Sequence, residues 1–362
     1  MQIRLFKNHN STIGYWECWT TSEGVVHSKW ATSLTGKPTC YQYRAEPMNV
    51  GKANETTPLE QAEKELLSAV KRKKDKGYVD TMKEAELPCT NSLGLLKPML
   101  ATPINKIKAE KIDWKNAFVQ PKLDGHRALY TDGILYSRTG QELNLPHVVK
   151  AIKASGLGHL HLDGELYIHG YTLQELSSLI KKQQHGTQHL EYHIYDIVND
   201  KPFVDRYAAI ILADTSHSHI KVVETTVITD NSGLVTLHKS HLSNHYEGSI
   251  LRMGRKGYQD GKRSRNLLKL KEFQDAEFEI IGVESGKPHI GAEGTFQVPI
   301  WKCAVGNGET FTVTAQGKRH EKHQLHEESA QHIGKKLTVK YHYLSKLGVP
   351  QLPVALRFFE GL

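Results

Sequence analysis

The chain has 362 residues, which is longer than one hydrophobic core usually serves, so two or three domains are expected. Hydrophobic residues make up 38% of it and charged residues 24%, and no run of 18 apolar residues occurs. These values exclude a membrane span and predict a globular protein of the cytoplasm. The net charge of +8 is concentrated in segments 71–76, 252–271 and 318–322, a distribution that suits a polyanionic partner such as nucleic acid.

Cysteine and histidine patterns do not predict a structural metal. The four cysteines lie far apart, without a Cys-x-x-Cys pair, which argues against a zinc ribbon and against a disulfide scaffold. Histidines at 238, 241 and 245, and again at 320, 323 and 326, have helical spacing. No cysteine or carboxylate pattern completes either group.

The first 80 residues are expected to form short strands and one helix. Aromatic residues and turn signals predict the strands Gln2–Phe6, Gly14–Thr20, Gly24–Trp30 and Thr39–Arg44. Thr57 and Glu60 predict a capping box with Pro58 at the first helical position. This unit is expected to end near Tyr78, and residues 81–94, which contain proline, asparagine and glycine, are predicted to be a linker.

A second domain is expected from about residue 95, and its central feature is Pro121-Lys122-Leu123-Asp124-Gly125-His126-Arg127. Hydrophobic residues precede this stretch, so Lys122 is expected where a buried strand ends and a turn begins. A lysine amine in a desolvated pocket loses proton affinity and can attack phosphorus. An ordinary strand end with exposed charges could carry the same lysine, aspartate, glycine and arginine. The motif alone does not decide between a catalytic lysine and an exposed one.

The segments that follow are predicted in order along the chain. Asp132-Gly133 is the signal for a two-residue hairpin turn, and Arg138 ends that hairpin. Later strands carry Asp163-Gly164-Glu165, Tyr195-Asp196 and Glu247-Gly248, and Thr172 with Glu175 caps a helix between the first two. In a strand, Lys269 and Lys271 share one face, which is costly unless an anion lies between them or the face is solvated.

Taken in order, these motifs resemble those of the covalent nucleotidyltransferases, and specifically the ATP-dependent DNA ligases. The resemblance covers residues from about 95 to the C-terminus. It implies an α+β fold with an adenylyltransferase (ATP-grasp-like ligase) domain of antiparallel sheets and helices at residues 95–274, followed by an OB-fold β-barrel at 275–362. It also implies ATP and Mg²⁺ as cofactors, nicked double-stranded DNA as the partner, and a monomer.

The resemblance assigns roles to individual residues. Lys122 is the nucleophile that attacks the α-phosphate of ATP, Asp124 orients the shell around the metal, and Arg127 and Arg138 hold AMP or the nick phosphate. Tyr195 stacks on adenine, and Glu165 is a ribose or metal contact. Glu247 is a metal-site carboxylate, and Lys269 and Lys271 contact the α-phosphate. Gln120 stands where many relatives have a glutamate that accepts from the adenine amino group.

Two further positions depart from the patterns of the families they resemble. Gln351 stands at the first arginine of the ligase terminal motif, so Lys335, Lys336 or Arg357 is a candidate replacement. Residues 1–80 resemble the WGR family, small domains attached to DNA-repair and nucleic-acid enzymes, through Trp30 and Lys76-Gly77-Tyr78, but Ala31 and Thr32 replace the glycine and arginine. DNA binding by this domain is therefore an expectation, with a passive domain as the alternative.

Four rival functions differ in what they require. A capping guanylyltransferase would end with an Arg-x-Asp-Lys motif, which is absent from the last domain. An RNA ligase usually lacks this OB domain and often lacks an arginine at the position of Arg127. An NAD⁺-dependent ligase would need a nicotinamide-recognition domain and a cysteine zinc finger. A non-catalytic DNA-binding scaffold would not retain every candidate catalytic residue.

Overall fold

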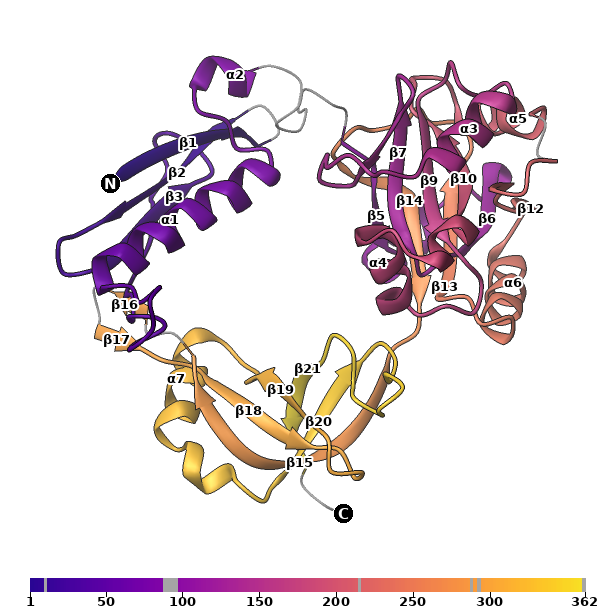
Figure 1. Cartoon of the computed structure of the whole chain (residues 1–362). Helices are drawn as coiled ribbons and strands as arrows, with labels where there is room; N and C mark the ends of the chain where they lie inside the picture. The colour runs from indigo at the N-terminus through magenta and orange to yellow at the C-terminus, as the bar shows by residue number, and fades with distance from the viewer. Residues whose placement is uncertain (10–11, 87–96, 214–215, 287–288, 292–293, 360–362) are drawn as a thin grey trace. The chain divides into compact units, whose positions relative to one another are not determined.

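The computed structural model describes residues 1–9, 12–86, 97–213, 216–286, 289–291 and 294–359. The chain divides into two compact units, one containing residues 97–271 and the other containing the N-terminal and C-terminal strands. Figure 1 follows the chain from an N-terminal sheet, through two central sheets, to a C-terminal sheet. The predicted α+β class, rich in sheets, is therefore confirmed. None of the helices in these ranges combines the length and the apolar surface needed to cross a bilayer.

The N-terminal sheet is antiparallel, with its strands in sequence order. All four predicted strands are present: β1 (Gln2–Asn8), β2 (Ile13–Thr20), β3 (Val25–Ala31) and β4 (Thr39–Arg44). Helix α1 (Pro58–Asp75) packs on this sheet through Ala62, Leu66 and Val70, which are buried with Leu5 and Trp16.

The start of α1 confirms the predicted capping box. The Thr57 N–H donates to Glu60 Oε2 at 2.8 Å, and the Glu60 N–H donates to Thr57 Oγ1 at 3.3 Å. A short helix, α2 (Met82–Glu86), occupies part of the segment predicted as a linker. Positions 87–94 of that linker lie outside the described residues.

The central unit contains two five-stranded sheets with the orders β11-β10-β9-β7-β8 and β12-β6-β13-β14-β5. The first comprises β7 (His126–Thr131), β8 (Ile134–Ser137), β9 (Leu162–Tyr167), β10 (Glu191–Ile197) and β11 (Ile220–Val222). The second comprises β5 (Leu100–Pro103), β6 (Ala117–Lys122), β12 (Thr226–Ile228), β13 (Gly248–Met253) and β14 (Arg263–Lys271). Each sheet has one parallel edge pair, β10 with β11 and β14 with β5, so the prediction of purely antiparallel sheets is wrong at these edges.

Four helices cover the central sheets: α3 (Pro146–Ala154), α4 (Leu173–Lys181), α5 (Phe203–Ile211) and α6 (Asn231–Ser243). The predicted box of Thr172 and Glu175 caps α4. The predicted hairpin turn is also confirmed, because Asp132 and Gly133 have φ values of 49° and 85° between β7 and β8. Such left-handed conformations match the twist of the flanking strands.

The C-terminal strands form an antiparallel sheet with the order β19-β18-β15-β20-β21. Its elements are β15 (Gln274–Ser285), β18 (Pro299–Ala304), β19 (Thr310–Thr314), α7 (Arg319–Glu327), β20 (Lys336–Tyr341) and β21 (Val354–Phe358), with a separate pair β16 (His289–Gly291) and β17 (Gly294–Phe296). No hydrogen-bonded ladder joins the edge strands β19 and β21 within the described ranges. The sheet is thus open between β19 and β21, and the ladders do not close it into a barrel.

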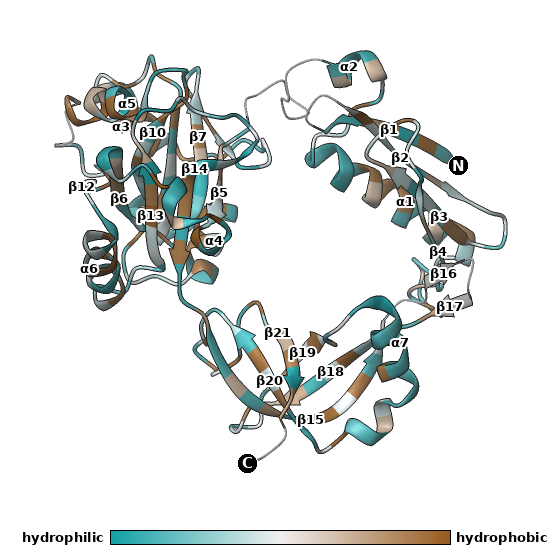
Figure 2. Cartoon of the chain, turned by 180° about the vertical axis from the view of Figure 1, so that it is seen from behind, coloured by the Kyte–Doolittle hydropathy of each residue, from teal (hydrophilic) through white to brown (hydrophobic). Residues whose placement is uncertain are grey.

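Buried hydrophobic side chains form a core on one face of each large sheet. Figure 2 shows hydrophobic residues along β13 and β18, whereas most of α7 is hydrophilic. In the C-terminal sheet, Ile280, Trp301 and Leu337 are fully buried and form the centre of the core. In the central unit, one core lies under β7, β9 and β10 and another lies on one face of β6 and β13.

Candidate active site

Lys122 is the last residue of β6, as the sequence predicts. Its neighbour in the register is Gly248, the first residue of β13, and Lys271 of β14 lies on the other side of that glycine. Gly248 has a φ of 150°, and a Cβ there would approach the Leu270 carbonyl oxygen to 2.3 Å. The row across these three strands therefore has a lysine on each side of a position that must lack a side chain.

Glu247 fills the space beside this row. Its carboxylate forms an ion pair with the Lys122 amine through Oε2, and Oε1 accepts from Lys271 Nζ at 3.3 Å. Only 6% of the Glu247 side chain is exposed. A carboxylate between two lysines offsets the repulsion that two like charges on one strand row would otherwise cause.

A cavity of about 580 Å³ opens beside Lys122. Gln120, Ile250 and Lys269 form the row two residues further along these strands, on the same face of the sheet, and all line the cavity. Burial lowers the pKa of Lys269, and the nearby charges of Lys271 and Lys122 lower it further. This wall of the cavity is therefore strongly cationic and suits a phosphate group.

The opposite wall comes from the other central sheet. Arg127 of β7 pairs with Glu165 of β9 in the register, and both residues line the cavity. Burial raises the pKa of Glu165 to about 7, although Lys122 and Arg127 act in the opposite direction. Gly125 lies so close to β9 that a Cβ would meet the Leu166 carbonyl oxygen at 2.5 Å.

Tyr195 reaches the cavity through an irregularity in β10. The register between β10 and β9 shifts between Ile194 and Asp196, which places Tyr195 at a β-bulge. Its hydroxyl donates to Glu165 Oε2 at 3.3 Å. The guanidinium carbons of Arg127 and Arg252 lie 5.7 and 5.5 Å from its ring centroid. The bulge thus supplies an aromatic face in a cationic setting.

Arg127 has protein partners that the sequence prediction did not include. It forms a two-point ion pair with the fully buried Asp163, in which Nε donates to Oδ1 at 2.8 Å. Its NH1 group also donates to the Met99 carbonyl oxygen at 2.6 Å, and the Tyr258 hydroxyl donates to Asp163 at 2.6 Å. Arg127 therefore has a structural role in the wall of the cavity, beside any contact with a ligand.

A second buried network fixes Gln120. Its Oε1 accepts from Arg252 Nε at 2.7 Å, and its Nε2 donates to Thr225 Oγ1 at 2.8 Å. Arg252 also pairs with Asp196, which forms a second ion pair with Arg206. Sequence reasoning missed Arg252, although its place in β13, two residues after the cavity-lining Ile250, was an available signal.

The remaining predicted residues lie at the edge of the cavity or away from it. Arg138 is exposed and lines the rim. Asp124 lies in the turn between β6 and β7 and is not among the lining residues. Gln351 lies in the C-terminal unit, where its backbone N–H donates to the Tyr343 carbonyl oxygen at 2.9 Å.

Metal-binding groups are sparse. In the described part of the chain, no group of three histidine, cysteine or acidic residues could hold a metal ion. His238 and His241 instead share the Ser249 hydroxyl at 3.0 and 2.8 Å. Glu165 and Glu247 both lie close to Lys122, so they can supply oxygen ligands to a divalent ion that takes its other ligands from phosphates and water.

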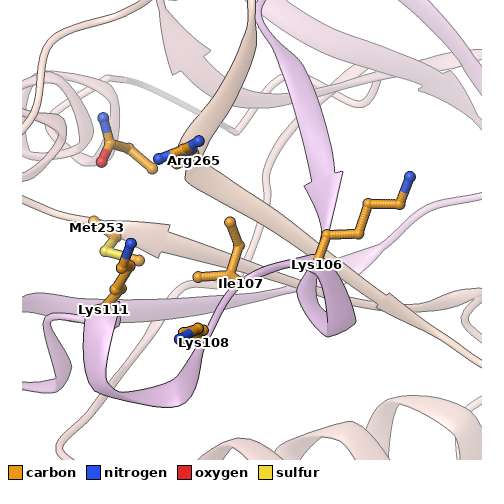
Figure 3. A pocket seen from close by; sticks show the side chains of 7 residues that line it. Lys106, Ile107, Lys108, Lys111, Met253 and Arg265 are labelled. Carbon is orange, nitrogen blue, oxygen red and sulfur yellow. The ribbon is translucent and has the colours of Figure 1, made fainter.

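A second cavity, of about 270 Å³, lies on the other face of β13. Met253, which lines it, packs with the core on the face opposite to Arg252. Figure 3 shows the side chains of Ile107 and Met253 with those of Lys106, Lys108, Lys111 and Arg265 around them. Those cations are all exposed: Lys106, Lys108, Lys111 and Arg265. Among the described residues none that lines this cavity is acidic, and we call it the basic cavity.

Comparison with known proteins identifies similar chains. Residues 98–271 match the family described as ATP dependent DNA ligase domain. A DNA ligase of African swine fever virus (isolate Pig/Kenya/KEN-50/1950) is 30% identical over 94% of this chain and 82% of its own. A DNA ligase of Archaeoglobus fulgidus is 24% identical over 68% of this chain and 46% of its own.

Solved structures share the fold. One described as "DNA binding with a minimal scaffold: Structure-function analysis of Lig E DNA ligases" superposes with a TM-score of 0.60 at 20% identity, covering 73% of this chain and 99% of that one. Another, described as Pmar-Lig_Pre, has a TM-score of 0.59 at 18% identity over 72% of this chain and 67% of that one.

Proposed function

Because this chain belongs to the ATP-dependent DNA ligases, we propose that it seals nicks in duplex DNA through an AMP adduct on Lys122. The observation that carries the proposal is the position of the Lys122 amine. It lies at the end of β6, beside a cavity that has lysines, arginines and two carboxylates in or next to its walls. An amine in such a setting is suited to attack a phosphate whose charge its neighbours neutralise.

The reaction consists of three displacements at phosphorus. Lys122 Nζ forms a bond to the α-phosphorus of ATP and pyrophosphate leaves. The 5′-phosphate of the nick then takes AMP from the lysine, and the free amine is restored. Finally the 3′-hydroxyl attacks the activated 5′-phosphate and AMP leaves, which joins the strands. In-line positioning and charge neutralisation provide most of the catalysis in such steps.

The cations of β14 have a direct role in this scheme. Lys269 lines the cavity two rows along the sheet from Lys122, and Lys271 reaches Glu247 beside Lys122. Both amines can therefore contact the α-phosphate and stabilise its developing charge. Glu247 holds the Lys122 amine at the strand end in the free protein. Arg138, which is exposed and lines the cavity, would contact AMP or the nick phosphate.

The adenosine would occupy the part of the cavity between the two sheets. Tyr195 would offer its ring to the base, and Glu165, which accepts from the Tyr195 hydroxyl in the free protein, would contact a ribose hydroxyl. Gln120 is the candidate partner of the adenine amino group. When bound, Mg²⁺ would neutralise phosphate charge, with Glu165 and Glu247 as its protein ligands and Asp124 orienting the surrounding shell.

We also propose domain boundaries and roles outside the cavity. Residues 95–274 would form the adenylyltransferase domain and 275–362 an OB-fold. The five antiparallel strands and the position of α7 between β19 and β20 support that fold. The open sheet is compatible with it, because an OB-fold barrel is only partly closed. Within it, Lys335, Lys336 or Arg357 would take the place of the arginine that Gln351 replaces.

Residues 1–80 are proposed as a DNA-binding domain with a WGR-like plan, joined by the 81–94 linker. The basic last turn of α1 supports DNA contact. Some of its aromatic rings have internal partners, since the Lys73 ammonium lies 5.2 Å from the Trp16 ring and 4.9 Å from the Tyr78 ring. Deleting residues 1–80 is expected to weaken nick affinity and to leave self-adenylylation intact, and equal loss of both would indicate a folding role.

The basic cavity is a second candidate contact for DNA. Lys106 and Lys111 end the two one-turn 3₁₀ helices Ile104–Lys106 and Ala109–Lys111, Lys108 lies between these helices, and the arginine comes from β14. Phosphate contacts by such exposed cations are independent of sequence and sensitive to salt. The proposal also keeps the cytoplasmic location and the monomeric state that the sequence predicts.

Labelling with α-³²P-ATP and Mg²⁺ tests the central claim. After incubation with labelled ATP, the protein is expected to keep the label when it is denatured. Incubation with labelled GTP is expected to leave no label, and Lys122→Ala is expected to abolish labelling by ATP. A label that survives in Lys122→Ala would refute the mechanism. Sealing of a nicked DNA duplex, compared with nicked RNA, separates a DNA ligase from an RNA ligase, and joining of RNA alone would refute the substrate assignment.

A further inference from the structure

Gln120 carries an ambiguity that a glutamate at the same position would not have. A side-chain amide has an oxygen that accepts and a nitrogen that donates, and the two ends are similar in size. An amide oxygen facing the base would accept from the adenine amino group. An amide nitrogen in the same place would instead donate to the carbonyl oxygen that guanine has there.

The surroundings of Gln120 permit only one orientation of this amide. On one side Arg252 Nε, which can only donate, lies 2.7 Å from Oε1. On the other side Nε2 lies 2.8 Å from Thr225 Oγ1 and 3.4 Å from the Tyr195 carbonyl oxygen, which can only accept. A reversed amide would place donor against donor at Arg252 and acceptor against acceptor at Tyr195.

Thr225 reinforces this polarity. Its hydroxyl donates to the Val223 carbonyl oxygen at 3.0 Å, so its proton is already used and its oxygen can only accept from Gln120. The hydrogen bonds therefore run in one direction, from the Arg252 guanidinium through Gln120 and Thr225 to a backbone carbonyl. Gln120 and Arg252 are 2% and 3% exposed, so water cannot replace a lost partner without cost.

Arg252 is itself held in place. Its NH1 group pairs with Asp196, and Asp196 is fixed by the two-point contact of Arg206, with Nε to Oδ1 at 2.6 Å. The backbone N–H of Ile197 also donates to Asp196 at 2.8 Å. Removing Arg252 would thus leave Asp196 with two other partners, so the buried carboxylate would not become an unpaired charge.

The Gln120 oxygen faces Arg252, which lines the cavity, whereas the nitrogen faces Thr225, which is not among the lining residues. We propose that Arg252 and Thr225 are positioning residues that keep the Gln120 oxygen on the cavity side, where it accepts from the base, so that this chain selects ATP over GTP without a glutamate. This inference rests on the proposed function, because it assumes that the nucleotide base lies against Gln120. The inference predicts that the preference for ATP over GTP depends on the orientation of the Gln120 amide. Variants of its hydrogen-bond partners should therefore change this preference in a specific pattern.

The experiment compares the rates of self-adenylylation and self-guanylylation for each variant, both with Gln120 and with Gln120→Glu. Arg252→Met, which removes the donor and keeps an unbranched side chain, is expected to lower the ATP-to-GTP ratio about tenfold or more. Thr225→Val is expected to lower it by a smaller factor, whereas Thr225→Ser, which retains the hydroxyl, is expected to keep it. In a Gln120→Glu background neither change should lower the ratio, because a carboxylate accepts in both orientations.

The outcomes separate the inference from the proposed function. A wild-type protein that forms no lysyl nucleotide would refute the proposed function. A labelled wild type whose ratio is unchanged by Arg252→Met and Thr225→Val would overturn the inference alone. An equal fall of the ratio with and without Gln120→Glu would show general distortion of the cavity and would also overturn it. If Arg252→Met does not fold, the Thr225→Val and Thr225→Ser pair decides.

Discussion

The carboxylate of Glu247 pairs with the amine of Lys122 across the ends of two neighbouring strands, β6 and β13. Gly248, the first residue of β13, follows Glu247 directly. Because it has no side chain, the Glu247 carboxylate has room to reach both Lys122 and Lys271. The amine proposed to attack ATP therefore has a defined position before any nucleotide binds. This preorganisation reduces the ordering that the reaction must otherwise supply.

Lys122→Arg separates the ion pair from the nucleophile. An arginine retains a cation beside Glu247, so we expect the protein to fold with little loss of stability, but a guanidinium does not lose its proton and cannot attack phosphorus. Labelling by α-³²P-ATP is expected to fall below detection. Lys150→Arg, an exposed lysine of α3, serves as the control and should label normally. Labelling of Lys122→Arg at the wild-type level would contradict the assignment.

Gly248→Ala tests the geometry beside this ion pair. The new methyl group would lie 2.3 Å from the Leu270 carbonyl oxygen and would require a φ near 150°, so β13 must shift. We expect a loss of about 2 kcal/mol or more in the free energy of unfolding and a large fall in self-adenylylation. Gly306→Ala is the matched control, because nothing lies within 4 Å of the new methyl group. Urea titration followed by labelling measures both effects, and a neutral Gly248→Ala would rule out the close packing.

The local elements of this fold could be predicted from the sequence because each depends on neighbouring residues. The Asp132-Gly133 turn and the Thr57 and Glu60 capping box are complete within four residues. Not every apolar residue of α1 faces the sheet: Ala62, Leu66 and Val70 are buried, whereas Leu59 and Leu67 are exposed. Periodicity alone cannot tell which edge of a stripe the sheet covers.

The long-range partners could not be predicted in this way. Arg127 was expected to contact a ligand, but its guanidinium binds Asp163, 36 residues away. Arg252 depends on Gln120, 132 residues away, and the two meet only because β6 and β13 are neighbours. Tyr195, to which the family resemblance assigns adenine stacking, lines the cavity, and the bulge that directs it there has no local sequence signal.

Glu165→Gln should change how stability depends on pH. Burial raises the pKa of Glu165 from an ordinary 4.5 to about 7, so between these values the folded protein binds more protons than the unfolded chain. Its stability therefore falls as pH rises through that window. Removing the carboxylate should stabilise the variant relative to wild type by up to about 3 kcal/mol as the pH rises from 4.5 to 7.

Urea unfolding at a series of pH values, without nucleotide or Mg²⁺, measures this difference. Glu110→Gln, an exposed carboxylate of the same unit, is the control and should show no comparable change with pH. Parallel curves for Glu165→Gln and wild type across the window would contradict the raised pKa.

The basic cavity makes a separate prediction about DNA. Each phosphate that a lysine neutralises releases counterions, so the logarithm of the affinity falls with the logarithm of the salt concentration by about 0.9 per contact. Replacing Lys106, Lys108 and Lys111 with glutamine should weaken binding to nicked DNA and reduce this slope by up to about 3. Self-adenylylation, which requires no DNA, is measured alongside as a check of folding.

The control must change the net charge equally at another place on the same unit. Lys150, Lys153 and Lys182 are also exposed, and replacing them with glutamine removes the same charge away from the basic cavity. If both triple variants lower the slope by the same amount, the effect comes from net charge and not from contacts at the cavity. A larger fall for the cavity variant, independent of DNA sequence, would identify phosphate contacts there, because such contacts do not read the bases.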